Sequence, residues 1–372
     1  MRRFDRMHKE SGEIIMKRIG RVWHEICEYD NIVIAHRNAS SGKRWYKEVK
    51  RMDADLDNHV LDLQLDLLFG TYKTSEYVKD TRKENEKMRN IYKLPYYPDR
   101  VAQWSVLQVV DKYFINTLID QTYSAIPGRG IHMALKHIRR DMRSDAEGTK
   151  YCLKLDVRKY YESINHGILK KKLSKLFKDK YLLDFFYEII DSISTNETLP
   201  NTGIPIGNYA SQYFGNYYLS DFDHWMKEEK KCKYYYRYMD DIVILSDSKE
   251  WLHQLRKEID NFLSTEKLQI KDNWQVFPVE ARGIDFVGYV IYHDYVLLRK
   301  STKKNMCRKM REIRKMRKED IGLAEFSSFH SYAGWLIPCN GYRLYQKHLQ
   351  PLRKPIRDYY FEVIKGWKTS DS

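Results

Sequence analysis

Two adjacent carboxylates, Asp240 and Asp241, lie within the stretch Tyr234–Leu245, which reads YYYRYMDDIVIL. The flanking runs Tyr234–Tyr238 and Ile242–Leu245 are rich in aromatic and β-branched residues, which predicts two strands joined by a tight turn at the Asp pair. Mg²⁺ in proteins prefers a few carboxylates together with substrate phosphate oxygens. A hairpin with both carboxylates at its tip is therefore a candidate metal site, although an Asp-Asp pair is also an ordinary polar turn.

A third carboxylate, Asp156, lies near the end of Tyr151–Val157 (YCLKLDV), which alternates apolar and polar residues as a half-buried strand does. Two strands that present Asp156 and Asp240 side by side would form a two-metal site. One ion would activate an attacking hydroxyl and the other would stabilise the leaving oxygen. The three carboxylates are the expected catalytic groups, and the expected metal ligands are Asp156, Val157, Asp240 and Asp241.

Three motifs in the order LDVRKYYESI, IPIGNYASQ and YMDD resemble the palm of reverse transcriptases. The resemblance implies an α+β right-hand polymerase fold with fingers, a palm whose antiparallel sheet is flanked by helices, and a helical thumb. It also implies RNA-templated DNA synthesis with two Mg²⁺ per active site and with template RNA, a DNA or RNA primer and dNTPs as partners. We expect an N-terminal extension and fingers in residues 1–150, a palm in 151–294 and a thumb in 295–372. The palm motifs are centred on Asp156, Gly207, Asp240 and Gly288.

The resemblance assigns two further roles in nucleotide binding. The basic segment Glu84–Arg100 resembles the fingers hairpin that holds the incoming triphosphate. Arg89 is preferred over Lys87 for this role, because a guanidinium can bind phosphate through two hydrogen bonds. Tyr161, five residues after Asp156, has the position of the steric gate that lies under the sugar and excludes a 2′-hydroxyl. The alternatives are a solvated basic loop for the first segment and ordinary core packing for Tyr161.

The loop before Asn208 departs from the usual pattern. Most reverse transcriptases carry a Gln before the Gly and a Pro after the Ser, where this chain has Ile206-Gly207 and Ser211-Gln212. This pattern, with WQVFPVEARGIDFVGY downstream, resembles the reverse transcriptases of diversity-generating retroelements, which are group II intron-like bacterial enzymes. The implied function is to copy a template-repeat RNA into cDNA with errors at adenines, and a basic accessory protein is an implied partner. Ile206 and Gly207 complete the expected dNTP-binding set, although Ile206 is also compatible with a neutral variation.

Basic residues indicate where nucleic acid would bind. From Arg299 to Lys318 there are eleven Lys and Arg against one acid, and Met306, Met310 and Ile313 recur at helical spacing. Such an amphipathic basic helix suits a thumb that follows the template–primer backbone, and the alternatives are a solvated surface or a membrane-surface helix. Arg129 in the IPGRG turn could approach a phosphate, or the turn could only connect two helices. The expected nucleic-acid-binding residues are Arg129, Gln212, Gly288, Lys303, Lys304, Arg308 and Lys309.

The composition agrees with a polyanionic partner. The 372 residues include 66 Lys and Arg against 51 Asp and Glu, a formal charge of +15, and neutralised phosphates release counterions. No apolar run approaches the roughly 18 residues of a membrane-spanning helix, and no apolar segment follows the charged N-terminus. Five scattered cysteines without a CxxC motif favour a reducing compartment. We therefore expect a cytoplasmic protein that does not bind membranes, and the resemblance implies that it is bacterial or phage-encoded.

Two other functions remain open. One is that of a different bacterial reverse transcriptase, such as a retron, group II intron-derived or phage-defence enzyme. The other is a non-catalytic RNA-binding scaffold, against which the intact Asp156, Asp240 and Asp241 argue.

Overall fold

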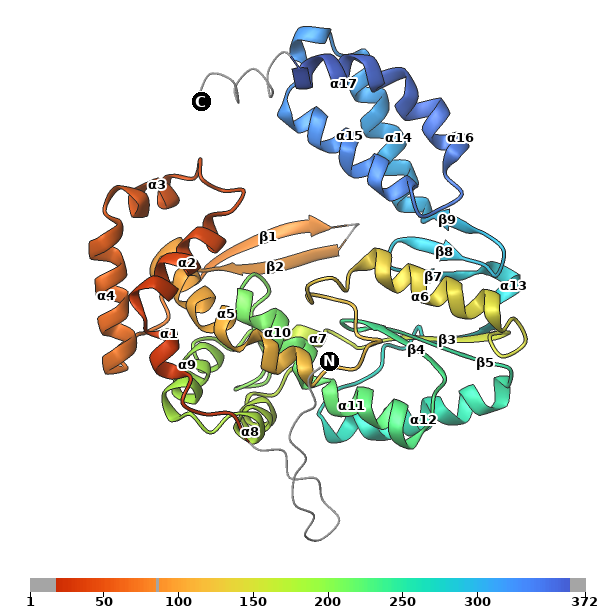
Figure 1. Cartoon of the computed structure of the whole chain (residues 1–372). Coiled ribbons are helices and arrows are strands. Elements are labelled where there is room, and N and C mark those ends of the chain that lie inside the picture. The colour runs from red at the N-terminus through yellow and green to blue at the C-terminus, as the bar shows by residue number, and fades with distance from the viewer. Residues whose placement is uncertain (1–17, 85–86, 362–372) are drawn as a thin grey trace. The chain divides into compact units, whose positions relative to one another are not determined.

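The computed structural model describes residues 18–84 and 87–361 (Figure 1). They form two compact units that are interleaved along the sequence. Unit 1 takes its residues from Met1–Asp120, Val157–Lys230 and Ile259–Lys271, and unit 2 from Gln121–Asp156, Lys231–Glu258 and Asp272–Ser372. Helices combine with antiparallel sheets in this structure, which confirms the α+β class. The division into fingers, palm and thumb stays a prediction.

The central sheet lies wholly in unit 2 and has the strand order β4-β5-β3-β6. All its neighbouring strands are antiparallel. The strands are β3 (Tyr151–Asp156), β4 (Tyr234–Tyr238), β5 (Asp241–Ser246) and β6 (Gln275–Pro278). The strands predicted over Tyr151–Val157, Tyr234–Tyr238 and Ile242–Leu245 are thus confirmed to within about one residue. Residues 242–245 of β5 are buried, as expected for a central strand that is covered on both faces.

One face of this sheet changes character along its length. Cys152, Lys154 and Asp156 of β3 share that face because side chains alternate along a strand. Cys152 lies opposite Leu245 and belongs to the main core of unit 2, whereas Asp156 lies opposite Asp241. The apolar end therefore anchors the sheet in the core, and the charged end forms the candidate catalytic site.

A second, three-stranded antiparallel sheet follows, with the order β7-β8-β9. Its strands are β7 (Ile284–Phe286), β8 (Tyr289–Ile291) and β9 (Val296–Leu298). The β-rich segment Arg282–Tyr289 favours one strand by its sequence, but the structure does not form one continuous strand there. Val287 and Gly288 have φ values of 45° and 89°, so they turn the chain back in a two-residue hairpin.

The C-terminal helices of unit 2 pack on this second sheet. The helix α14 (Lys300–Lys315) buries Met306, Met310 and Ile313 in the same core as Phe286. It is followed by α15 (Leu323–Leu336), α16 (Tyr342–Leu344) and α17 (Arg353–Tyr359). The basic segment Leu344–Lys365 favours one long helix by its composition, and its last residues, 362–365, lie outside the described part of the structure. The described part contains a π-helix, η4 (Tyr345–Leu349), and a 3-10 helix, η5 (Gln350–Leu352), before α17. Pro351 in η5 lacks the N–H that a continuous α-helix requires.

Unit 1 combines a hairpin with helices. Its strands β1 (Val78–Glu84) and β2 (Lys87–Lys93) pair antiparallel. The hairpin therefore begins earlier than the predicted segment Glu84–Arg100, whose last residues form the π-helix η1 (Tyr96–Arg100). Its role as fingers stays a prediction. Two residues occupy helix ends as their types favour. Gly70 takes a left-handed conformation with φ 67° after α4 (Leu56–Phe69), and Asn165 Oδ1 accepts a bond from Ile168 N at 3.1 Å before α8 (His166–Leu176). The main helices are α2 (Tyr29–Ser40), α4 (Leu56–Phe69), α5 (Val101–Asn116), α8 (His166–Leu176), α9 (Lys180–Asp191) and α10 (Tyr209–Tyr218).

The turn at Gly288 generates a stability prediction. A Cβ atom at Gly288 would lie 2.5 Å from Cζ3 of Trp335, and the φ of 89° disfavours any side chain. Gly288→Ala should therefore lower the free energy of unfolding by about 1–3 kcal/mol, measured by urea denaturation. Gly334→Ala is the matched control, because a Cβ there meets no atom within 4 Å and α15 favours alanine. Equal midpoints for the two variants would contradict the account of the turn.

Candidate active site

The hairpin that carries the two adjacent carboxylates places them in different settings. Tyr238 pairs with Asp241, so Met239 and Asp240 are the two central residues of the turn. Met239 has a φ of 54°, a left-handed conformation that is uncommon for a residue with a long side chain. Asp240 thus lies at the tip of the hairpin, and Asp241 is the first residue of β5.

A buried arginine holds this turn. Arg237 is fully buried, and its Nη1 donates a hydrogen bond to the carbonyl of Met239 at 3.1 Å. The backbone of Arg237 also accepts a bond from Tyr123 N and donates one to Gln121 O, each at 3.0 Å. A strained conformation persists only where its surroundings fix it. We did not predict Arg237 as a site residue, although a charged residue inside the aromatic strand YYYRY was an available signal.

The carboxylate that directly faces Asp156 is Asp241, and the expectation that Asp156 and Asp240 would lie side by side is off by one residue. Directly opposed residues in an antiparallel pair have Cβ atoms about 4.5–5.5 Å apart, so two negative charges are held close together. Burial raises the pKa of Asp241, and the charge of Asp156 raises it as well. The neighbouring Lys154 acts in the opposite direction.

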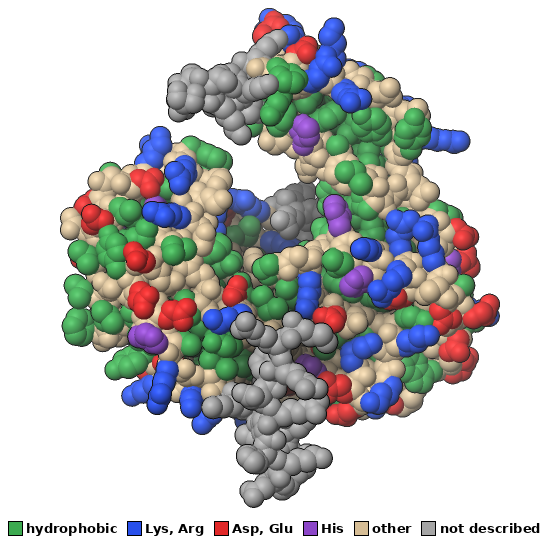
Figure 2. Space-filling model, in the orientation of Figure 1, with side chains coloured by type: hydrophobic (Ala, Val, Ile, Leu, Met, Phe, Trp, Pro, Cys, Tyr) green, Lys and Arg blue, Asp and Glu red, His purple; other side chains and the backbone are tan. Residues whose placement is uncertain are grey.

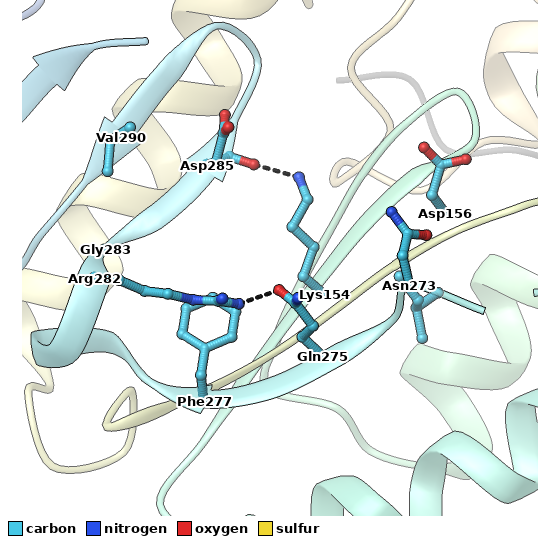
Figure 3. Close-up of a pocket in the computed structure, with 10 residues that line it drawn as sticks. Lys154, Asp156, Asn273, Gln275, Phe277, Arg282, Gly283, Asp285 and Val290 are labelled. Carbon is cyan, nitrogen blue, oxygen red and sulfur yellow. Dashed lines mark hydrogen bonds between the residues drawn. The ribbon is translucent and has the colours of Figure 1, made fainter. Parts of the chain in front are cut away.

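Lys154 is the second site residue that the sequence analysis missed. Its Nζ lies 2.9 Å from Oδ1 and 3.2 Å from Oδ2 of Asp241, and it also donates to the backbone carbonyl of Asp285 in β7. Figure 3 shows Lys154 reaching from β3 toward Asp285, with Asp156 on the same strand. The available signal was the spacing, since a residue two positions before Asp156 must share its face of the sheet.

A cavity of about 400 Å³ adjoins Lys154 and Asp156 (Figure 3). Arg282 forms part of its wall, with its guanidinium 3.7 Å from the ring centre of Phe277 and a hydrogen bond to Gln275. Carboxylate, amide, ammonium and guanidinium groups thus surround one concave space beside the candidate catalytic residues.

The donor groups suit a hard divalent cation only in part. Within the ranges 18–84 and 87–361, no three His, Cys, Asp or Glu side chains are arranged so that they could hold a metal ion. Asp241 is bound to Lys154, and the expected ligands Asp156 and Asp240 lie on β3 and in the turn before β5. A pair of carboxylates is sufficient for Mg²⁺, because this ion keeps several waters and substrate oxygens. Val157, the residue after Asp156, is fully buried. Its role as a metal ligand stays a prediction.

The expected nucleotide-binding residues belong to unit 1, and Ile206 and Gly207 lie against the strand β2 that carries Lys87 and Arg89. Arg89 is exposed on β2 and pairs in register with Arg82. The carbonyl of Ile206 accepts a bond from Tyr92 N at 2.9 Å. Gly207 has a φ of 123°, and a Cβ there would lie 2.6 Å from the carbonyl of Tyr92, so this position requires glycine.

The remaining nucleotide-binding residues are less informative. The side chain of Lys87 lies outside the described part of the structure. Tyr161 is half-buried, and its hydroxyl and Cε1 lie 3.5 and 3.6 Å from the position of a Cβ on Gly215 of α10. The ring therefore packs closely on this helix, which is compatible with both the steric gate and ordinary packing.

The expected nucleic-acid-binding residues are distributed over both units. On α14, Lys303, Lys304 and Arg308 are exposed, whereas Lys309 forms an ion pair with Glu325 at 3.3 Å. Figure 2 shows Lys and Arg side chains projecting from the helical end of unit 2. Elsewhere, Gln212 is exposed on α10, Arg129 is half-buried in its turn, and Gly288 lies against Trp335.

Comparison with known proteins identifies the family. The family described as "Reverse transcriptase (RNA-dependent DNA polymerase)" matches residues 81–291, which is more than half of the chain and includes the three carboxylates. The chain therefore belongs to the reverse transcriptase family.

Two relatives are similar to parts of this chain. The group II intron-encoded protein LtrA of Lactococcus lactis subsp. cremoris is 21% identical over 238 residues, which are 61% of this chain and 38% of that protein. A putative COX1/OXI3 intron 1 protein of Saccharomyces cerevisiae is 22% identical over 128 residues, 33% of this chain and 15% of that protein. The chain thus spans well under half the length of these curated relatives.

Solved telomerase structures are also similar. Apo telomerase from Candida tropicalis, truncated from its C-terminal domain, matches with a TM-score of 0.47 and 13% identity over 64% of this chain and 59% of that one. Telomerase from Candida albicans in complex with a TWJ fragment of telomeric RNA matches with a TM-score of 0.48 and 12% identity over 66% and 52%. Both TM-scores lie below 0.5, and we base no inference on them.

Among the helices of the described residues, none has both the length and the apolar character that crossing a bilayer requires.

The opposed carboxylates generate a second prediction. Asp156→Asn removes the negative charge that faces Asp241, and like charges directly opposite each other destabilise a strand pair. In EDTA, this variant should therefore gain about 0.2–1 kcal/mol of unfolding free energy, measured from the urea midpoint. Asp294→Asn, an exposed acid in the loop before β9, is the control. A midpoint for Asp156→Asn at or below that of the control would show that repulsion is not significant here.

Proposed function

We propose that this protein is an RNA-directed DNA polymerase that extends a DNA or RNA primer with dNTPs on an RNA template. The observation that supports this most strongly is the antiparallel pairing of Asp156 with Asp241, next to the turn that carries Asp240. This arrangement concentrates negative charge at the end of a sheet whose opposite end is fixed in a core. Membership of the reverse transcriptase family agrees with this proposal.

The proposed mechanism assigns a task to each group. Asp156 and Asp240 would hold two Mg²⁺, which when bound assist the attack of a primer 3′-hydroxyl on the α-phosphate and the departure of pyrophosphate. Arg89 would bind the triphosphate, and Tyr161 would exclude a 2′-hydroxyl. Arg237 would keep Asp240 in place through the Met239 carbonyl. The basic face of α14 would neutralise backbone phosphates.

We further propose that the enzyme acts in a diversity-generating retroelement, in the cytoplasm of a bacterium, with a basic accessory protein as partner. Support for this comes from Ile206, where most reverse transcriptases carry Gln. Its backbone is fixed by the bond to Tyr92 on the fingers hairpin, so the aliphatic side chain has a defined position near the expected nucleotide site. The loss of a polar contact there would loosen the selection of the incoming nucleotide.

A retron, group II intron-derived or phage-defence reverse transcriptase is the second candidate, and it shares the same chemistry. The neighbouring genes distinguish the two, because a near-repeat beside a variable gene is expected only for a diversity-generating retroelement. A non-catalytic RNA-binding scaffold would bind RNA without extending a primer.

The role of the turn carboxylate is tested by Asp240→Asn. The substitution removes one negative charge and preserves the size of the side chain. Primer extension on an RNA template should fall by about 10³-fold or more, because both the activation of the nucleophile and the stabilisation of the leaving group depend on the ions. Template–primer affinity, measured by fluorescence anisotropy, should stay within about threefold of wild type. Extension at the wild-type rate would exclude Asp240 from the active site.

The retroelement proposal is tested by Ile206→Gln. A side-chain hydrogen bond contributes on the order of 0.5–1.5 kcal/mol to binding free energy. Ile206→Gln should therefore change error rates several-fold without abolishing synthesis. We expect the wild type to misincorporate mainly opposite template adenine and Ile206→Gln to lower this error selectively. Deep sequencing of cDNA from one defined RNA measures both, with Ile206→Leu as the control. Uniformly low error at all four template bases in the wild type would refute the proposal.

A further inference from the structure

Helix α4 of unit 1 carries apolar residues on two opposite faces. Its inner face buries Val60, Leu63 and Leu67 at the helical spacing i, i+3 and i+7. A second apolar row recurs at i, i+4, i+7 and i+8 on the outer face, and we call it the α4 stripe: Leu61 (45% exposed), Leu65 (50%), Leu68 (46%) and Phe69 (75%). A surface helix normally has one apolar face, and a helix that is apolar all round is typical of a buried position. The α4 stripe therefore has the character of a surface that another molecule covers.

The orientation of α4 is fixed by polar contacts along its inner side. Trp23 Nε1 of α1 (Trp23–Ile26) donates a buried hydrogen bond to the carbonyl of Leu67 at 3.1 Å. Gln64 Nε2 donates to the carbonyl of Cys27 at 2.7 Å. A rotation of α4 that buried the stripe would break both bonds and expose the inner leucines. The stripe is therefore exposed by the design of unit 1.

The charge around the stripe is opposite in sign to that of the whole chain. From Met52 to Tyr72 there are five Asp and no Lys or Arg, in a chain with a formal charge of +15. Two of the α4 acids have neutral partners, since Asp57 accepts from the hydroxyl of Tyr29 and Asp66 accepts from that of Thr71. Figure 2 shows hydrophobic and acidic side chains together on the side of unit 1 where Figure 1 places α4.

This combination of apolar and acidic groups restricts what can cover the stripe. Nucleic acid and anionic membranes are negatively charged, so the aspartates repel both. A second copy of the chain that paired through the same face would place these aspartates opposite each other, because a twofold interface brings one patch against itself. A helix with an apolar row and flanking Lys or Arg satisfies both the stripe and the acids.

We propose that the α4 stripe is a docking site for a partner protein that presents an amphipathic helix with Lys and Arg along the borders of its apolar row. The inference goes beyond the proposed function, because no residue of α4 takes part in the chemistry assigned above. It adds a protein-binding surface to unit 1.

The test measures binding of a synthetic helix to the full chain. The probe is a fluorescein-labelled peptide of Leu and Lys only, about 18 residues or five turns long, with Leu at i, i+3, i+4 and i+7 spacing. Fluorescence anisotropy should show saturable binding to the wild type. Leu65→Gln should weaken it about tenfold, which is typical of a truncated interface anchor. Leu199→Gln is the matched control, because Leu199 is a leucine of unit 1 outside α4 and is 56% exposed. It should bind as the wild type does.

A second comparison tests the role of the acids. A peptide with Glu in place of every Lys should bind at least tenfold more weakly, because it presents like charges to the aspartates. Asp62→Asn should weaken binding of the Leu/Lys peptide at low salt. In about 1 M salt the variant and the wild type should bind equally, because the Debye length falls to about 3 Å. Equal affinity for the two peptides would refute the basic character of the partner.

The other outcomes also decide the matter. No binding of the Leu/Lys peptide, or equal losses in Leu65→Gln and Leu199→Gln, would refute the docking site. A wild-type dimer in light scattering that becomes a monomer in Leu65→Gln would assign the stripe to a second copy of the chain. Sedimentation with phosphatidylserine vesicles that is lost in Leu65→Gln would assign it to a membrane surface, and either result would overturn the proposal. Urea midpoints verify that each variant is folded.

Discussion

The structure depends on the close approach of like charges at one end of a sheet. The register of β3 and β5 places Asp156 opposite Asp241, and the turn before β5 adds Asp240. Such an arrangement is unfavourable in the free protein, because burial and mutual repulsion both oppose ionised carboxylates. It becomes favourable when a dication or another positive group lies among them. The site is therefore a feature that the rest of unit 2 must stabilise.

Three devices supply that stability. The apolar end of the sheet is fixed in a core where Cys152, Leu245 and Phe277 are buried. Arg237 fixes the turn from the opposite face, through the carbonyl of a residue with positive φ. Lys154 neutralises Asp241 on the same face as the acids. Two of these three groups are cations: Lys154 binds an acid directly, and Arg237 binds the backbone of the turn that carries Asp240.

Sequence patterns predicted the strands of the central sheet, but they did not predict which side chains contact one another. Alternation in YCLKLDV and the β-rich runs around Asp240 and Asp241 predicted the strands, since periodicity reports which faces are buried. The register between strands depends on pairing between distant parts of the chain, which periodicity does not report. For this reason Asp240 was expected opposite Asp156, whereas Asp241 occupies that position. The turn at Val287 and Gly288 was missed because the apolar run IDFVGYVI continues through it. The sequence shows that Lys154 shares a face with Asp156 and that Arg237 interrupts an aromatic strand, but it does not show which groups these side chains bind.

The central claim is that Asp156 and Asp240 together hold the ions that support RNA-directed DNA synthesis. The most direct measurement is anomalous diffraction from crystals of the full chain with Mn²⁺, an RNA template, a primer that lacks its 3′-hydroxyl, and the matching dNTP. We expect anomalous density ligated by Asp156, Asp240 and the triphosphate, with Asp241 still bound to Lys154. Ordered nucleic acid and dNTP without Mn²⁺ at these two carboxylates would contradict the account.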